Sequence, residues 1–262
     1  MNGLQRALRD PRSTAELIEP ALAEAERDDF IDIHDPAVSI LQTRGSREIL
    51  NATLGLCASP DPKRRALAAE ILGQLGFGDR TFPEECCDAL LDLVRRDADR
   101  DVLTTAVFAL GHLGNRRGDP DLIALKAHPD NEVRRGVAFS LNGATSLEAI
   151  QTLLELMEDP YELAQDWATT AIAELESGDS PEIRAALWQR VSDSDRIVRA
   201  EALNGLARRQ DRRAVLRIIA ELSGADADSF HDAAKTVLGL EEGQSFSTAY
   251  LLKALRRSLV VD

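Results

Sequence analysis

The sequence predicts an all-α fold: an α-solenoid, that is, a right-handed superhelix of about six stacked helix pairs with capping helices at both ends. Three observations favour it: the composition, an internal repeat of about 33 residues, and amphipathic patterning within each repeat. Hydrophobic residues make up 44% of the chain and aromatic residues only 4%. The apolar residues are mostly Ala and Leu, which favour helices because they lose little side-chain entropy there. Runs of β-branched and aromatic residues, typical of strands, are missing from the sequence.

The repeat is clearest in three segments: DRDVLTTAVFALGH, DNEVRRGVAFSLNG and DRIVRAEALNGLAR. We number each copy from the position that Val holds in these three, and the six anchors are then Arg64, Val102, Val133, Ala164, Val198 and Phe230. A small residue stands four positions after each anchor and a large aliphatic residue eight positions after it. Both positions fall on one face of a helix. Six second helices are therefore predicted, over 61–74, 99–112, 130–143, 161–174, 195–208 and 227–240.

Capping residues mark where these helices begin and end. Aspartates three positions before the anchor are predicted N-caps, namely Asp61, Asp99, Asp130 and Asp195. Pro62 stands in a first turn, where its missing N–H costs nothing. Glycines nine positions after the anchor either end the helix or let the next helix come close: Gly73, Gly111 and Gly239. First helices of each pair are predicted over 46–57, 84–95, 119–127, 146–157, 180–191 and 211–223.

The pattern Asp-x-x-Val-Arg, continued by Ala and then Leu-Gly, resembles the short HEAT-like repeats of the phycobilisome-lyase type found in bacterial HEAT-repeat proteins. The best matches are 130–143 and 195–208, and the resemblance covers roughly 46–240. The two ends depart from the pattern. Residues 1–45, with helices around 2–9, 13–27 and 35–43, are a predicted N-terminal helical cap, and 241–262 hold a predicted C-terminal capping helix. A single domain over 1–262 is expected.

The resemblance implies that the second helices line a concave groove. Residues at positions +2, +3, +6 and +10 after each anchor point away from the predicted core and into that groove. The candidate partner-binding residues are Glu70, Phe108, His112, Arg135, Phe139, Asp166, Trp167, Thr170, Glu201 and Asn204. Exposed aromatic side chains among polar ones are typical of binding hot spots. Trp188, in contrast, lies on a first helix and is expected to belong to the core.

The chain is strongly acidic, with 31 Lys and Arg against 45 Asp and Glu, which gives a net charge of −14. Such a surface repels nucleic acid and anionic lipid and attracts basic proteins, although acidity also simply favours solubility. We therefore expect a basic protein partner, no nucleic acid and no membrane. No segment is long and apolar enough for a signal sequence or a membrane span, so a cytoplasmic location is expected. The oligomeric state stays open, with a monomer favoured.

No residue pattern indicates catalysis, a metal site or a cofactor. The histidines His34, His112, His128 and His231 are scattered, and the His-Glu pairs that bind iron in the HEAT-like deoxyhypusine hydroxylases are missing. No CxxC motif accompanies Cys57, Cys86 and Cys87, and the adjacent pair is expected to be a chance neighbour pair. HEAT-like alkylpurine DNA glycosylases use Trp and Asp, but Asp166 and Trp167 are adjacent and point about 100° apart on a helix.

Three functions follow as hypotheses. The first is a non-catalytic protein-binding scaffold that holds its partner in the groove, for example as an inhibitor or immunity protein for a basic toxin or enzyme. The second, implied by the resemblance, is a phycobilisome-lyase-like or chaperone-like helper in chromophore attachment or protein modification. The third is a HEAT-like DNA-binding protein, which the charge disfavours.

Overall fold

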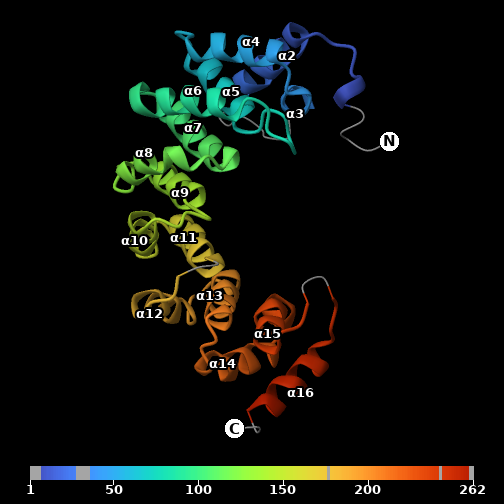
Figure 1. Ribbon diagram of the computed structural model, residues 1–262, viewed down its shortest axis with the longest axis vertical. Helices are drawn as coiled ribbons and strands as arrows, with labels where there is room; N and C mark the ends of the chain where they lie inside the picture. Colours follow the sequence, from blue (N-terminus) through green and yellow to red (C-terminus); the bar gives the residue numbers. More distant parts are fainter. Residues whose placement is uncertain (1–6, 28–35, 176–177, 242–243, 260–262) are drawn as a thin grey trace. The chain divides into compact units, whose positions relative to one another are not determined.

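The computed structural model describes residues 7–27, 36–175, 178–241 and 244–259. In these ranges all regular secondary structure is helical, as predicted (Figure 1). The N-terminal helices are α2 (Thr14–Arg27) and α3 (Pro36–Arg44), which match two of the predicted cap helices. The third, predicted over 2–9, lies largely outside the described residues.

Six helix pairs follow in the described part of the chain. They are α4 (Arg47–Cys57) with α5 (Pro62–Gly73), α6 (Pro83–Arg96) with α7 (Arg100–Leu113), α8 (Asp119–Ala124) with α9 (Asn131–Ser140), α10 (Leu147–Leu156) with α11 (Glu162–Glu174), α12 (Pro181–Arg190) with α13 (Arg196–Arg208), and α14 (Arg213–Leu222) with α15 (His231–Leu238). Helix α16 (Thr248–Ser258) comes last, and short 3-10 turns precede α8 and α15. The predicted helix–turn–helix unit is confirmed.

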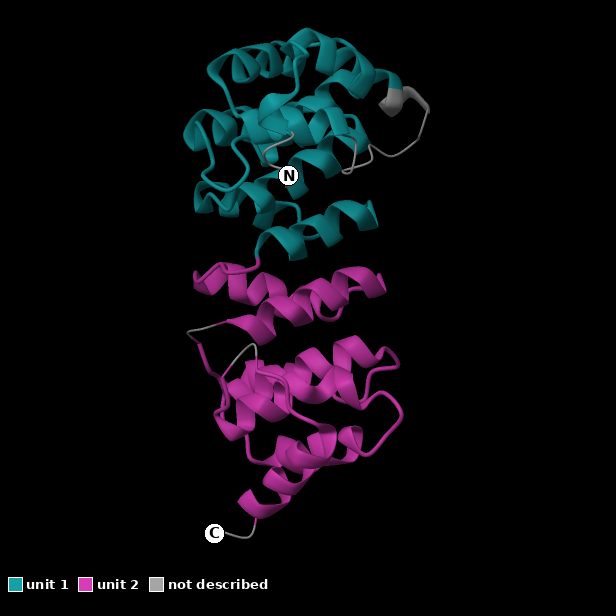
Figure 2. Ribbon diagram, turned by 90° about the vertical axis from the view of Figure 1, so that its right-hand side faces the viewer, with its two compact units in different colours: residues 1–141 teal, residues 142–262 magenta. Residues whose placement is uncertain are grey.

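The chain divides into two compact units, Met1–Leu141 and Asn142–Asp262 (Figure 2). In each unit, consecutive second helices pack directly on one another. The contacts run from α5 to α7 to α9 in unit 1 and from α11 to α13 to α15 in unit 2. The first helix of each pair packs on its own second helix, so each unit consists of two layers of helices.

Small residues set the distance between second helices. A Cβ added to Gly73 would lie 2.8 Å from the Cα of Ala109 on α7. One added to Gly205 would lie 2.8 Å from the Cα of Ala173 on α11. Both contacts are shorter than normal van der Waals distances, so only glycine fits. The expectation that Gly73 permits a close approach is confirmed, and Gly239, at φ +64°, ends α15 as expected.

The predicted caps are also confirmed. Four aspartate side chains accept hydrogen bonds from main-chain N–H groups in the first turn: Asp61 from Lys63, Asp99 from Asp101 and Val102, Asp130 from Glu132 and Val133, and Asp195 from Ile197. Each bond satisfies a donor that the helix itself leaves without an acceptor. Pro62 occupies the first turn of α5.

Arginine one position after the anchor has a structural role that the sequence analysis did not assign. In three repeats its guanidinium donates to carbonyls of the turn before the second helix: Arg65 to Ser59 and Pro60, Arg134 to His128 and Pro129, and Arg199 to Asp193 and Ser194. These bonds satisfy turn carbonyls that belong to neither helix. Arg65 additionally pairs with Asp97 in the turn of the next repeat, at 2.6 Å.

The prediction of which positions on the second helices face solvent is partly wrong. Positions +4 and +8 are buried as expected, for example Ala106 and Leu110. Several residues at +2 and +3, which were expected to face the groove, are buried as well: Ala66, Leu67, Thr104, Gly136, Ala200 and Ala233. They are buried because each second helix is flanked by its neighbours in the same layer, so the solvent-facing stripe is narrower than the pattern suggested.

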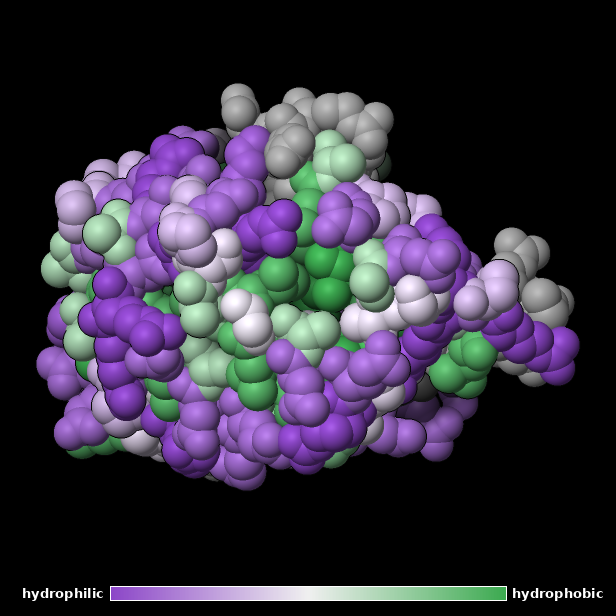
Figure 3. Space-filling model, turned by 90° about the horizontal axis from the view of Figure 1, so that it is seen from above, coloured by the Kyte–Doolittle hydropathy of each residue, from purple (hydrophilic) through white to green (hydrophobic). Residues whose placement is uncertain are grey.

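The N-terminal helices cover one end of unit 1. Helix α2 packs on α3, α4 and α5, and Arg44 donates to the main-chain carbonyls of Ala7, Asp10 and Arg12. Seen from above, polar side chains dominate this face and surround a patch of apolar ones (Figure 3).

None of the helices within the described ranges has the length and apolar character needed to cross a membrane.

Candidate functional site

All ten candidate residues lie on second helices, and each retains at least part of its solvent exposure. They divide between the two units. Unit 1 carries Glu70 on α5, Phe108 and His112 on α7, and Arg135 and Phe139 on α9. Unit 2 carries Asp166, Trp167 and Thr170 on α11, and Glu201 and Asn204 on α13.

Four of the candidates in unit 1 form one cluster, which we call the aromatic cluster: Phe108, His112, Arg135 and Phe139. The ring centroids of Phe108 and Phe139 lie 5.2 Å apart, with an angle of 40° between the planes. The ring of His112 meets Phe139 edge-on at 5.0 Å, and the Arg135 guanidinium lies 4.9 Å from the Phe108 centroid. Aromatic pairs of this geometry contribute about 0.5–1.5 kcal/mol beyond area burial. The cluster is therefore a preorganised apolar surface.

Two glycines provide the space that the rings occupy. A Cβ on Gly136 would lie 3.1 Å from the Phe108 ring, and one on Gly111 would lie 2.8 Å from Cε1 of Phe139. Gly111 was expected to let the next helix approach, and the structure confirms this. The close approach of α7 and α9 thus holds both rings half-buried rather than freely exposed.

Charged groups around the aromatic cluster are only partly balanced. Arg135 pairs with Glu132 at 2.7 Å. Arg80 donates to the main-chain carbonyl of His112 at 2.9 Å. Although His112 stays exposed, partial desolvation of its ring and, second, the Arg80 charge lower its pKa. His112 is therefore neutral at pH 7, and Arg80 and Arg135 supply the positive charge here.

Glu70 differs from an ordinary surface carboxylate. Burial raises the pKa of Glu70 to about 7, against the opposing effect of a hydrogen bond from Gln42. Gln42 also donates through Nε2 to the Glu70 carbonyl, at 2.9 Å. Near neutral pH this carboxyl is therefore close to half protonated, and Glu70 contributes less negative charge than the sequence suggested.

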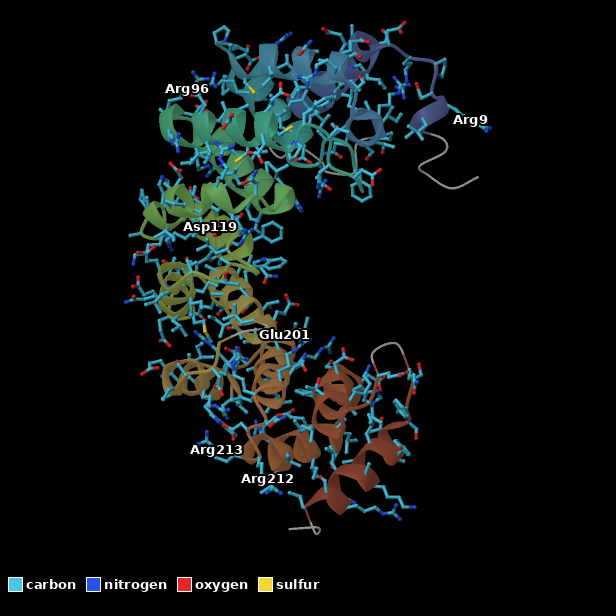
Figure 4. The ribbon with its side chains drawn as sticks, in the orientation of Figure 1. Arg9, Arg96, Asp119, Glu201, Arg212 and Arg213 are labelled. Atoms are coloured by element: carbon cyan, nitrogen blue, oxygen red, sulfur yellow. The ribbon has the colours of Figure 1, made fainter. Side chains whose placement is uncertain are left out.

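In unit 2, carboxylates crowd the solvent-facing side of the second helices. Burial, and then the charges of Asp195 and Asp193, raise the pKa of Asp166 to about 6. Burial, and then Glu174 and Asp232, raise the pKa of Glu201, which Figure 4 marks on α13. Neither Asp166 nor Glu201 forms an ion pair within the described residues. A cation placed beside them would relieve this repulsion, so the surface is suited to a basic group.

The remaining candidates flank these carboxylates. Asn204 accepts a hydrogen bond from the Thr236 hydroxyl at 2.8 Å, which links α13 to α15. Both residues stand six positions after their anchors, as Phe108 and Phe139 do in unit 1. Trp167 follows Asp166 directly on α11, and Thr170 lies one turn later; both are half-buried.

A family model described as HEAT repeats matches residues 87–173. This segment of the chain is similar to HEAT repeats. This agrees with the resemblance seen in the sequence, and the matched segment includes Phe108, Phe139 and Trp167.

Relatives share the repeat architecture. Protein YibA of Escherichia coli is 25% identical over 193 residues, which cover 70% of this chain and 67% of YibA. The X-ray structure of YibA aligns with a TM-score of 0.66 and 21% identity, and covers 97% of this chain and 99% of YibA.

Two further solved structures are similar in fold. The complex of CpcE and CpcF of phycocyanin lyase from a Nostoc species has a TM-score of 0.50 and 18% identity over 95% of this chain and 96% of that chain. A designed armadillo repeat protein in complex with the peptide (KR)4 has the same TM-score and identity over 79% of this chain and 97% of that chain. At these identities the likeness shows the fold alone.

The three cysteines are buried on first helices, Cys57 on α4 and Cys86 and Cys87 on α6. Cys57, Cys86 and Cys87 are buried and free. Burial raises the pKa of all three thiols, to about 11 for Cys57 and about 12 for Cys86. Protonated, buried thiols are poor nucleophiles and poor metal ligands. Within the described ranges, His, Cys, Asp and Glu side chains form no group of three or more that could hold a metal ion.

The prediction for Trp188 is wrong. Its indole is partly exposed on α12, donates to Asp211 at 3.0 Å and lies 5.1 Å from the Arg213 guanidinium. It is not in the core because it does not share the buried side of α12, which carries Ile183 and Leu187. The arginine-rich segment 208–213, RRQDRR, is the signal in the sequence that would have drawn attention to this region.

Proposed function

We propose that this chain is a non-catalytic scaffold that binds a partner protein on the solvent-facing side of its second helices. The aromatic cluster is the observation that carries the proposal. Its rings are fixed by helix packing and remain half exposed, so a partner that covers them gains apolar burial with little loss of side-chain entropy. The designed armadillo repeat protein, which is similar in fold and was solved in complex with a peptide, supports this proposal.

The partner carries a basic segment that contacts unit 2. Asp166 and Glu201 have raised pKa values because burial desolvates them and, second, because carboxylates crowd around them, and bringing a lysine or arginine close would offset that repulsion. The (KR)4 peptide in the armadillo complex is an example of such a segment on a related fold. Long-range attraction by a chain of net charge −14 would also speed the encounter with a basic protein.

Inhibition of a basic enzyme or toxin is the specific role that we favour. A scaffold that covers a cationic active surface with carboxylates and aromatic rings blocks access without any chemistry of its own. In that role the complex has a fixed stoichiometry and the enzyme loses activity in proportion to the scaffold bound. A general adaptor, in contrast, leaves the partner active.

A peptide titration tests the charge preference directly. The chain has two tryptophans, so its ¹H–¹⁵N spectrum holds two indole signals, and the Trp167→Phe variant assigns them. The (KR)4 peptide is expected to shift the Trp167 indole of the wild type saturably and more weakly as salt increases. An aspartate–glutamate peptide of equal length is the control. Equal shifts with both peptides, or none with (KR)4, would contradict the basic-partner proposal.

A lyase-like helper is the second candidate, favoured by the similarity to CpcE and CpcF over 95% of this chain. If it is correct, co-expression with a bilin and an acceptor protein yields a coloured covalent adduct that is missing without this chain. Equal yields with and without the chain would remove this candidate.

A further inference from the structure

Unit 2 contains a hollow of about 770 Å³ on the layer of first helices. Pro181, Ala185 and Trp188 form its apolar lining and recur every three to four residues, so they share one side of α12. The opposite side of this helix is buried through Ile183 and Leu187. The hollow therefore lies on first helices and includes none of the ten candidate residues, all of which lie on second helices.

Hydrogen bonds and a cation fix the Trp188 ring in the hollow. Its indole N–H donates to Asp211, whose side chain is only 4% exposed and also accepts from Arg213 Nε at 2.9 Å. The Arg213 and Trp188 bonds hold the pKa of Asp211 below its usual range, despite burial. Asp211 thus stays ionised and holds both neighbours. One ring and one guanidinium are preorganised side by side.

Arginine side chains line this hollow although the chain as a whole is acidic. Arg184 and Arg213 line it together with Asp179 (Figure 4 labels Arg213), and Arg184 pairs with Asp179 while Arg213 pairs with Asp211. Arg209 is buried, and its guanidinium donates to the carbonyls of Gly205 and Ile172 rather than to a carboxylate. The exposed Arg213, whose pairing with Asp211 uses only Nε and Nη2, is therefore the group at this hollow that is complementary to a carboxylate.

We propose that the hollow binds a segment of a partner protein in which an apolar or aromatic side chain stands next to a carboxylate. The apolar side chain contacts Trp188, Ala185 and Pro181. The carboxylate pairs with Arg213, which is 68% exposed and uses Nε and Nη2 for Asp211, so that Nη1 can donate to a further partner. This chemistry is the opposite of that proposed for the second helices, and it does not depend on that proposal.

An acidic peptide fits the hollow better than a nucleic acid. A nucleic acid presents many phosphates to a chain of net charge −14, whereas a peptide presents one or two carboxylates. The flat indole favours one apolar side chain rather than a stack of bases.

The Trp188 indole signal provides the test, because it reports on the hollow while Trp167 reports on the second helices. We expect the blocked peptide acetyl-Glu-Phe-Glu-amide to shift the Trp188 signal of the wild type saturably. The Trp167 signal should stay in place. The matched peptide acetyl-Lys-Phe-Lys-amide should bind about tenfold more weakly, since its charges oppose those of Arg213.

Variants locate the binding. Arg213→Gln should weaken binding of the acidic peptide about tenfold. The rest of its spectrum should stay dispersed, as expected of a folded chain. Arg196→Gln is the control and should bind the acidic peptide as the wild type does. Arg196 is an exposed arginine on the first turn of α13 and pairs with Asp226. A lack of saturable shift at millimolar peptide, equal binding of the lysine peptide, or no effect of Arg213→Gln would overturn the proposal. Stronger shifts of Trp188 with an oligothymidine than with the acidic peptide would overturn it in favour of nucleic acid.

Discussion

Individual side chains in this chain behave differently from what their residue type alone suggests. Glu70 and Asp166 have raised pKa values because helix packing desolvates their carboxyl groups. For Asp166, nearby carboxylates raise the pKa further. The spacing of residues indicated that these side chains are not in the core. It could not show how far neighbouring helices cover them, since that depends on packing between repeats.

A pH-dependent stability test follows for Glu70. Its pKa in the folded chain is about 7, above the usual 4.5, so the fold favours the protonated form. The fold therefore loses stability as pH rises from about 4.5, and the loss is complete above 7. We expect Glu70→Gln to be more stable than the wild type by about 1–2 kcal/mol at pH 8, after allowing for partial exposure, and equal to it at pH 4.

Urea unfolding at both pH values measures this difference. Glu48→Gln, at an exposed position of α4, serves as the control and should follow the wild type at both. If Glu70→Gln tracks the wild type at pH 8, the Glu70 carboxyl is not desolvated as described.

A second test at this scale concerns Phe139. Its ring contacts both Phe108 and His112, so Phe139→Ala removes two aromatic contacts and leaves a gap between α7 and α9. We expect a loss of about 1–3 kcal/mol in unfolding free energy, less than for a fully buried phenylalanine. Leu147→Ala, at a leucine that is 79% exposed, should cost much less. Equal losses in the two variants would show that the aromatic cluster is not packed as described.

At the scale of helices, local signals in the sequence predicted most boundaries correctly. Asp99 and Asp130 begin α7 and α9 because an aspartate there satisfies first-turn N–H groups regardless of what packs around it. Which sides of the helices are buried was predicted less well. Leu67 and Gly136 are buried because second helices also pack side by side, and Trp188 is partly exposed because it does not share the buried side of α12. These outcomes depend on contacts between repeats, which a single repeat does not encode.

Glycine substitutions test the close packing of second helices. A Cβ on Gly205 would collide with the backbone of Ala173, so Gly205→Ala should destabilise the chain by about 1–3 kcal/mol despite the higher helix propensity of alanine. Gly55 lies inside α4 with nothing within 4 Å of an added Cβ. Gly55→Ala should therefore stabilise the chain by about 0.5–1 kcal/mol. Thermal and urea unfolding measure both, and the same sign for the two would contradict the packing described.

At the scale of the whole molecule, the repeats produce two kinds of surface. The second helices present an aromatic cluster in unit 1 and crowded carboxylates in unit 2, whereas the first helices of unit 2 present the hollow at Trp188, lined by Arg184 and Arg213. The sequence predicted the fold and the acidic character of the chain, because these follow from composition and period. It missed the hollow, because the residues that line it come from α12 and α14, which are separated in the chain by α13.

The central claim is that a partner protein binds on the second helices. The most direct measurement is quantitative capture from native lysate by the wild type and by a folded Phe108→Ala, Phe139→Ala, Trp167→Ala variant. A Leu147→Ala, Leu216→Ala variant is the control, because it removes two leucines that are 79% and 64% exposed on first helices. We expect the wild type and the control to retain the same basic protein in a fixed ratio, and the triple variant to lose it. Equal retention by the triple variant, or loss by the control alone, would contradict the claim.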